Sequence, residues 1–226
     1  MSLADWLSLA DWRRRVADLY SSVRAIAATD PEAAWDHWRA TRDALYRTHP
    51  QSPVPSAERL VFSGRYWPYD PGFRFEVEVD VDVEGSSSNA AGPPDTGQGA
   101  AATSLGIQLP MSSGVGMTFT PIGTVTLPFP VGPRTLGVFW MVDYAGGLFL
   151  PFRDASNGAT TYGAGRYLLD AAKSADLGMD ASATRLILDF NFAFQPSCAF
   201  DPRWSCPLAP PGNRLDLAIE AGERLA

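Results

Sequence analysis

The chain is poor in basic and in metal-binding side chains. Its 226 residues include two histidines, two cysteines and a single lysine, and the formal net charge is −7. A nucleic-acid backbone is bound through clustered basic side chains, so the composition argues against a nucleic-acid partner. The few His and Cys residues do not follow the close spacing of a zinc half-site, so no metal is predicted.

Long hydrophobic runs are also missing. The most apolar stretch, "TLGVFWMV", is bounded by Arg134 and Asp143 and falls far short of the roughly 20 residues that span a bilayer. The first residues, "MSLADWLSLADWRRRV", lack the basic start and apolar run of a secretory signal. We therefore expect no membrane partner and a cytoplasmic location, where thiols normally stay reduced.

Familiar catalytic and cofactor motifs are absent as well. The chain has no Gly-x-Ser-x-Gly elbow, no Walker loop and no His-Glu-x-x-His pair. The "GAG" at 163–165 lacks the third glycine of a dinucleotide-binding fingerprint. No cofactor is therefore predicted. The sequence leaves open whether the chain is an enzyme and what its oligomeric state is.

Helical patterning is confined to the N-terminal part. Apolar side chains recur at three- and four-residue steps over 5–28. The following "TDP" supplies Asp30 as an N-cap and Pro31 as the first residue of a second helix, which runs to about Arg47. We expect residues 1–50 to form a helical segment packed on the sheet and residues 51–226 to form a β domain. Within it, the Gly-, Ser- and Ala-rich stretch 85–102 is predicted to be a flexible loop insertion.

The rest of the chain is patterned for strands. The segment "FRFEVEVDVDVE" at 73–84 alternates apolar and charged side chains, which indicates an antiparallel strand with one buried face. The dipeptide Asn157-Gly158 predicts a hairpin turn. The fold class is therefore mainly β, an antiparallel barrel or sandwich of about seven to ten strands with two N-terminal α-helices. Further strands are predicted at 104–109, 116–127, 135–143, 147–153, 160–169, 185–194 and 215–220.

Polar side chains are expected to gather on this sheet. In strand 185–194 the odd positions place Asp189 and Asn191 side by side, opposite an apolar face. Arginine forks bind carboxylate or phosphate groups, and two arginines lie in the neighbouring hairpin, where Tyr162 and Arg166 share a face of the returning strand. Such residues can frame a polar or anionic ligand, or they can simply tie loops to the sheet. The candidate set is Arg153, Asp154, Tyr162, Arg166, Asp189 and Asn191.

The two cysteines, Cys198 and Cys206, lie in a Pro-rich loop after the last aromatic strand. Three interpretations stay open: a structural zinc, which would need both histidines as well; a disulfide; or two buried thiols packed among aromatic side chains. The end of this loop, "CPLAPPGN", cannot form regular ladder bonds because each proline lacks a donor. We expect it to form one wall of a pocket whose other wall is the "FRD" hairpin. At Gly165 we expect another backbone to approach closely.

Three ordered blocks carry a family resemblance. They are "RYWPYDPGFRF", "GLFLPFRDASNGATTYGAGRYLLD" and "LDFNFAFQPSCAFDPRWSCPLAPPGNRLDLAIEAGE". Together with "DWRRRVADLYSSVR" and "HPQSPVP" they resemble the bacterial and archaeal family known as domain of unknown function 1684. The resemblance implies a whole-chain unit and assigns no catalytic residue, because the family has no established activity. It places the six candidate residues, both cysteines and Asn213 within the family's motifs.

The leading functional hypothesis is a cytoplasmic protein that binds a small polar or anionic molecule. One alternative is an enzyme, for example a hydrolase that works through carboxylates or a Cys198 thiolate. The other is a structural or partner-binding module without a ligand.

Overall fold

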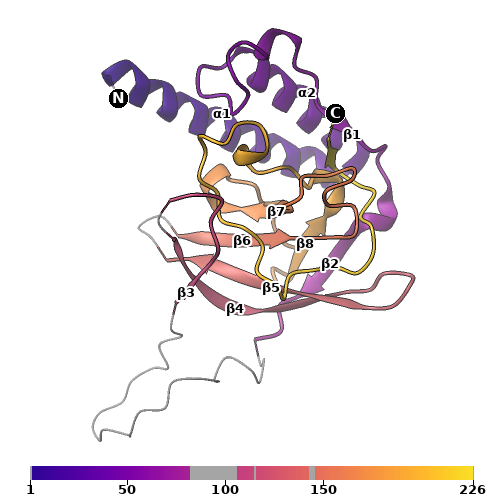
Figure 1. The fold of residues 1–226 in the computed structure, drawn as a ribbon. Helices are drawn as coiled ribbons and strands as arrows, with labels where there is room; N and C mark the ends of the chain where they lie inside the picture. Colours follow the sequence, from indigo (N-terminus) through magenta and orange to yellow (C-terminus); the bar gives the residue numbers. More distant parts are fainter. Residues whose placement is uncertain (1, 82–105, 115, 143–145, 226) are drawn as a thin grey trace, which may run out of the picture.

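The computed structural model describes residues 2–81, 106–114, 116–142 and 146–225. Two helices open the chain, α1 (Leu3–Ala27) and α2 (Pro31–Thr48), and both lie on the same side of the sheet (Figure 1). The predicted start of α2 is confirmed, because the Asp30 side chain accepts from the amide of Ala33 and Pro31 is the first helical residue. No helix within the described ranges is both long and apolar enough to cross a membrane. The predicted insertion 85–102 lies outside the described residues.

The strands form three antiparallel sheets. The largest has the order β3-β4-β5-β6-β7, a second pairs β2 with β8, and a third pairs β1 with β9. The predicted class of a mainly antiparallel β fold with two N-terminal helices is thus confirmed. The strand bounds are β1 (Arg65–Tyr66), β2 (Arg74–Glu78), β3 (Ile107–Gln108), β4 (Thr118–Leu127), β5 (Arg134–Met141), β6 (Gly147–Phe152), β7 (Arg166–Asp170), β8 (Arg185–Asp189) and β9 (Glu223–Arg224).

Single bridges connect the β2–β8 pair to both flanks of the large sheet. Asp80, just after β2, bridges Thr124 in β4, and Phe194, after β8, bridges Tyr167 in β7. Short 3-10 turns fill the connections, and one of them follows β8 directly. These turns are η1 (Arg59–Val61), η2 (Pro71–Phe73), η3 (Ala171–Lys173), η4 (Phe190–Phe192) and η5 (Ser197–Ala199).

The core has two parts. One cluster packs both helices against the sheet, with Val23 and Trp38 meeting side chains such as Phe119 and Phe194. The second cluster lies between the large sheet and the β2–β8 pair and contains only residues of the β region. In β2 the buried Phe75 and Val77 alternate with exposed glutamates, as the sequence pattern predicts.

Several strands are shorter than predicted because side chains compete for backbone partners. The 160–169 strand begins only at Arg166, since the preceding turn is held by side-chain bonds: Asn157 Oδ1 accepts from the Asp154 amide at 2.7 Å, and Asp154 Oδ1 accepts from the Ser156 amide at 2.7 Å. The 185–194 strand ends at Asp189. No strand forms at 215–220, where the described backbone bonds the "FRD" region instead, and the final strand is β9.

Candidate functional site

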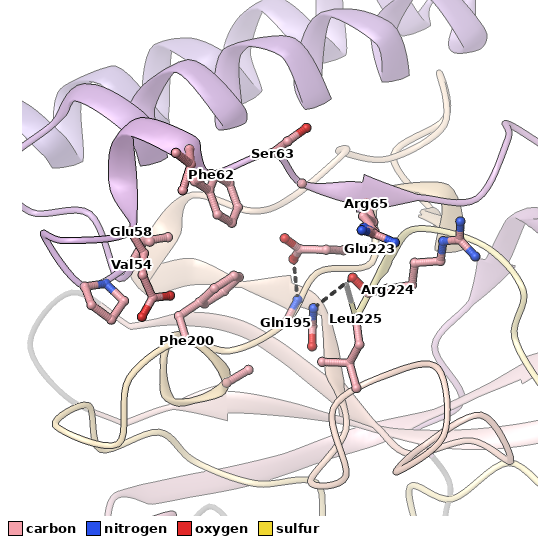
Figure 2. Close-up of a pocket in the computed structure, with 14 residues that line it drawn as sticks. Val54, Glu58, Phe62, Ser63, Arg65, Gln195, Phe200, Glu223, Arg224 and Leu225 are labelled. Atoms are coloured by element: carbon pink, nitrogen blue, oxygen red, sulfur yellow. Dashed lines mark hydrogen bonds between the residues drawn. The ribbon is translucent and has the colours of Figure 1, made fainter.

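A cleft of about 570 Å³ lies where the exit from α2, the segment after η4 and the C-terminal strand meet. Figure 2 shows Gln195 and Glu223 at its centre, Phe62 and Phe200 towards one side, and Arg65 and Arg224 towards the other. The volume falls within the roughly 300–1,000 Å³ of small-molecule sites. It is lined by Val54, Pro55, Glu58, Val61, Phe62, Ser63, Gly64, Arg65, Gln195, Ala199, Phe200, Glu223, Arg224 and Leu225.

The centre of the cleft is polar and buried. Glu223, only 1% exposed, forms an ion pair with Arg42 of α2 at 2.8 Å and accepts from the Gln195 amide at 2.8 Å. Gln195, 4% exposed, donates from Nε2 to the carbonyl of Arg224 at 3.3 Å (Figure 2). Its Oε1 atom has no hydrogen-bond partner among the described residues. A buried acceptor without a donor is costly.

The rim of the cleft carries two arginines in direct opposition. Arg65 in β1 and Arg224 in β9 are Cα partners in the antiparallel pair, and both are exposed. Neither forms an ion pair with another described side chain. Like charges placed directly opposite each other destabilise a strand pair. An anion between them would remove that repulsion.

A neighbouring groove continues the cleft beyond the two arginines. It has a volume of about 370 Å³ and shares Gly64, Arg65 and Arg224 with the cleft. Its far wall carries two tryptophans, Trp35 and Trp67. The arginine pair therefore lies at the junction of two open spaces, where a bound anion can reach it from either side.

The predicted residues Asp154 and Arg166 come together, but in the interior. Their side chains are 0% exposed and form an ion pair at 2.9 Å. Arg166 Nη1 and Nη2 also donate to main-chain carbonyls of the C-terminal segment: Ile219 at 2.8 Å, Ala221 at 2.5 Å and Glu223 at 3.2 Å, while its Nε has no partner among the described residues. The guanidinium thus holds the C-terminal segment against β7, and neither side chain lines the cleft.

The close approach expected at Gly165 is confirmed. The residue has φ +103°, and a Cβ at this position would lie 2.4 Å from the carbonyl oxygen of Phe152. Only glycine adopts this conformation readily, so the "GAG" sequence serves to bring β7 against β6.

Asp189 and Asn191 also lie together, but they do not occupy one strand face as predicted. The strand ends at Asp189, whose Oδ1 accepts from the amide of Asn191 at 3.0 Å and from its Nδ2 at 2.8 Å, and so begins η4. Asn191 then exchanges two bonds with the backbone of Asp70. Arg74 Nη1 lies 3.3 Å from Asp189 Oδ2. Burial nevertheless raises the pKa of Asp189, although the bonds from Asn191 and Arg74 oppose the shift.

The Pro-rich loop and the "FRD" hairpin do lie together, as expected. Arg153 donates its amide to the Asn213 carbonyl at 2.8 Å and accepts from the Leu215 amide at 2.8 Å. Between loop and hairpin lies a second cleft of about 460 Å³, lined by Pro110, Arg153, Gly163, Ala164, Leu208, Ala209, Pro211 and Arg214. Of the six predicted ligand residues, Arg153 lines this cleft. Tyr162 lies in the turn before β7 rather than on the strand itself.

Cys198 and Cys206 are both buried and both free. The amide of Cys198 donates to Cys206 Sγ at 3.3 Å. Within the described residues no group of three or more His, Cys, Asp or Glu side chains is arranged to hold a metal ion.

Sequence reasoning missed the residues at the centre of the cleft. Gln195 and Glu223 stand within the quoted family blocks, but nothing in their local pattern marks them. Arg65 and Arg224 are separated by most of the chain and become neighbours only through the β1–β9 pair.

Comparison with known proteins identifies the family. The family model described as "Protein of unknown function (DUF1684)" matches residues 62–224. The chain is also similar to the solution NMR structure of the uncharacterized protein from gene locus rrnAC0354 of Haloarcula marismortui, with a TM-score of 0.57 and 30% sequence identity over 86% of this chain and 94% of that one. No curated protein matches. The chain therefore belongs to the DUF1684 family.

Proposed function

We propose that the protein binds a small anionic molecule that also carries a hydrogen-bond donor, in the cleft around Gln195. The observation that carries this proposal is the Oε1 atom of Gln195, which is buried on the cleft wall without a donor. An N–H or O–H group of a ligand would satisfy it. This bond would form at a buried position, where an acceptor without a donor costs about 1–3 kcal/mol.

The arginine pair supports an anionic ligand. Arg65 and Arg224 present two guanidinium groups at the same rim, and a guanidinium binds carboxylate or phosphate through two parallel bonds. The ligand's anion would lie between them while its donor group reaches Gln195. The buried Glu223 is already paired with Arg42, so it orients the wall rather than repelling the ligand.

Binding is favoured over catalysis by the bonding of the carboxylates. Asp154 and Glu223 are each buried against an arginine and held by backbone groups. Neither has the open, unpaired geometry of a general acid or base. The second cleft, between Arg153 and Arg214, offers the same kind of anion site without the buried acceptor. Because Arg153 lines this second cleft, a role for it in ligand binding stays a prediction.

We also propose that the sheets together form an incomplete barrel. The bridges Asp80–Thr124 and Tyr167–Phe194, which join the β2–β8 pair to both flanks of the large sheet, support this arrangement.

A thermal-shift screen against carboxylates, sugar phosphates and nucleotides tests the binding proposal. A ligand at 100 times its Kd stabilises the folded state by about 2.7 kcal/mol, which is easily measured. We expect an anion in the library to raise Tm, and we expect that rise to disappear in the double variant Arg65→Ala, Arg224→Ala. Both residues are exposed, so the variant should fold as the parent does.

Two controls locate the site. Arg214→Ala removes a guanidinium from the second cleft and should leave the rise in Tm intact. Gln195→Met removes the buried acceptor and should weaken binding without changing the charge. A rise that survives in the double variant but disappears in Arg214→Ala would place the ligand in the second cleft. Absence of any rise across the library would leave the structural alternative as the better account.

A further inference from the structure

The sulfur of Cys206 lies next to the backbone of Cys198. Cys198 is the middle residue of η5, and Cys206 lies in the Pro-rich loop that folds back over it. The amide of Cys198 donates to Cys206 Sγ at 3.3 Å. The amide nitrogen and the sulfur of a cysteine are linked only through Cα and Cβ. A sulfur bonded to the amide is therefore within reach of the neighbouring thiol after at most a χ1 rotation between staggered wells.

Both cysteines are held in place by their surroundings. The Cys206 amide donates to Ser112 Oγ at 2.9 Å, and the Ser112 amide returns a bond to the Cys206 carbonyl at 2.9 Å. Cys198 is fixed by the η5 turn, in which Phe200 donates to the Ser197 carbonyl at 3.1 Å. Two anchored segments keep the sulfurs as neighbours, so no large backbone movement is needed for them to react.

The environment makes the two thiols unequal. The neighbouring side chains of Cys206, Ser112 and Tyr162 lower the pKa of Cys198 to about 6, against the opposing effect of burial. The pKa of Cys206 is raised, because it donates to Cys198 and is itself buried. A thiolate beside a protonated thiol is the arrangement of an attacking and a resolving cysteine.

A cavity reaches one cysteine of the pair. Cys206 lines a cavity of about 290 Å³ between the helices and β7, together with Trp204, Ser205 and Lys173. Lys173, the single lysine of the chain, is close enough to favour a negative charge on Cys206. A cavity of this volume has room for a small hydroperoxide.

We propose that Cys198 and Cys206 form a dithiol site that is oxidised reversibly by small hydroperoxides. The Cys198 thiolate attacks the terminal oxygen of the hydroperoxide, the O–O bond breaks, and the alkoxide or hydroxide leaves and takes a proton from solvent. Cys198 is then a sulfenic acid. The Cys206 sulfur attacks the Cys198 sulfur, an S–S bond forms, and water leaves with the proton of Cys206. Two electrons pass from the thiols to the peroxide, and an external thiol such as dithiothreitol returns them.

Mass spectrometry of the intact protein tests this site. Reduced protein is treated with hydrogen peroxide, quenched with catalase and alkylated with iodoacetamide. We expect a mass loss equal to two hydrogens, no alkylation, a crosslinked peptide joining the two cysteines, and full reversal by dithiothreitol. Two alkylatable thiols after excess peroxide, or a disulfide between two chains only, would overturn the proposal.

Single variants assign the two roles. Cys206→Ser should accumulate a sulfenic acid at Cys198 that dimedone traps. Cys198→Ser should react about tenfold or more slowly, because burial still raises the pKa of the remaining Cys206 thiol and keeps it protonated at neutral pH. Tyr162→Phe removes one donor to the thiolate, so the pH midpoint of Cys198 alkylation should move upward from about 6. Equal peroxide reactivity of both serine variants would overturn the assignment of Cys198 as the attacking thiol.

Discussion

Two buried ion pairs, Asp154–Arg166 and Arg42–Glu223, contact the same C-terminal segment but differ in their surroundings. Arg166 is bonded to Asp154 and to three carbonyls between Ile219 and Glu223, and neither charged side chain is exposed. Arg42 is bonded to the Glu223 carboxylate, and its guanidinium also lies over the ring of Tyr46 at 4.3 Å. The Asp154–Arg166 pair lies wholly in the interior. The Arg42–Glu223 pair lies next to an open cleft, which Glu223 lines.

The difference shows that the buried Asp154–Arg166 pair does not line the cleft, whereas Glu223 does. The "FRD" and "GAGRYLLD" sequences supply a charge pair whose bonds go to the protein's own backbone. Arg65, Gln195 and Glu223 of the cleft also lie within the quoted family blocks, but on short or irregular segments whose local pattern does not mark them. Arg166 bonds three backbone carbonyls and so determines the path of the C-terminal segment, whereas Glu223 of the second pair accepts from the backbone amide of Gln195 beside the cleft.

The largest loss of stability should come from Asp154→Asn. The substitution leaves the fully buried Arg166 guanidinium without a counter-charge, and breaking such a pair costs about 3–5 kcal/mol. Urea denaturation should show this loss in the free energy of unfolding. Asp216→Asn is the matched control, because Asp216 forms an exposed pair with Arg134 and should be replaceable with no measurable change. Equal losses in the two variants would contradict the distinction between buried and exposed pairs.

A smaller loss should follow from Glu223→Gln. The amide keeps an acceptor for Arg42, and three aromatic rings, including Tyr46 and Phe194, remain around the guanidinium. We expect a loss of about 1–3 kcal/mol, from the charge-assisted part of the bonds. Ligand-induced stabilisation should fall as well, because the Glu223 carboxylate positions Gln195.

Glu220→Gln is the control for Glu223→Gln, because Glu220 lies three residues earlier and is exposed. It should change neither the free energy of unfolding nor the ligand-induced stabilisation. A loss in Glu223→Gln as large as that in Asp154→Asn would remove the distinction between the two ion pairs.

The smallest effect should be a change in pH dependence from Asp189→Asn. Burial raises the pKa of Asp189 in the folded state, so the folded protein binds this proton more tightly than the unfolded chain. Its contribution to stability is therefore fully present below the ordinary carboxyl pKa and is lost as the pH rises through the folded-state value. The Tm of the parent relative to the variant should fall as the pH rises above the ordinary carboxyl pKa of about 4. A Tm difference that grows with pH would reverse this assignment.

Local chemistry was readable from the sequence, and long-range pairing was not. Asp30 and Pro31 predicted the start of α2 because an N-cap acts over three residues. The alternation around Phe75 and Val77 predicted β2 because side chains of a strand alternate between two faces. The prediction that Asp189 and Asn191 share one strand face was wrong. The strand ends at Asp189, and the Asn191 side chain bonds the backbone of Asp70, which lies far away in the sequence.

By itself, then, the sequence determined the antiparallel β class, the two N-terminal helices and the family. These follow from periodicity, caps and recognisable blocks, which are properties of contiguous residues. Only the tertiary structure decided that Arg166 and Asp154 are interior, that Arg65 faces Arg224, and that Gln195 keeps an unmet acceptor on a cleft wall. The reason is physical: burial and unmet hydrogen bonds depend on which distant segments pack together, and no local pattern encodes that.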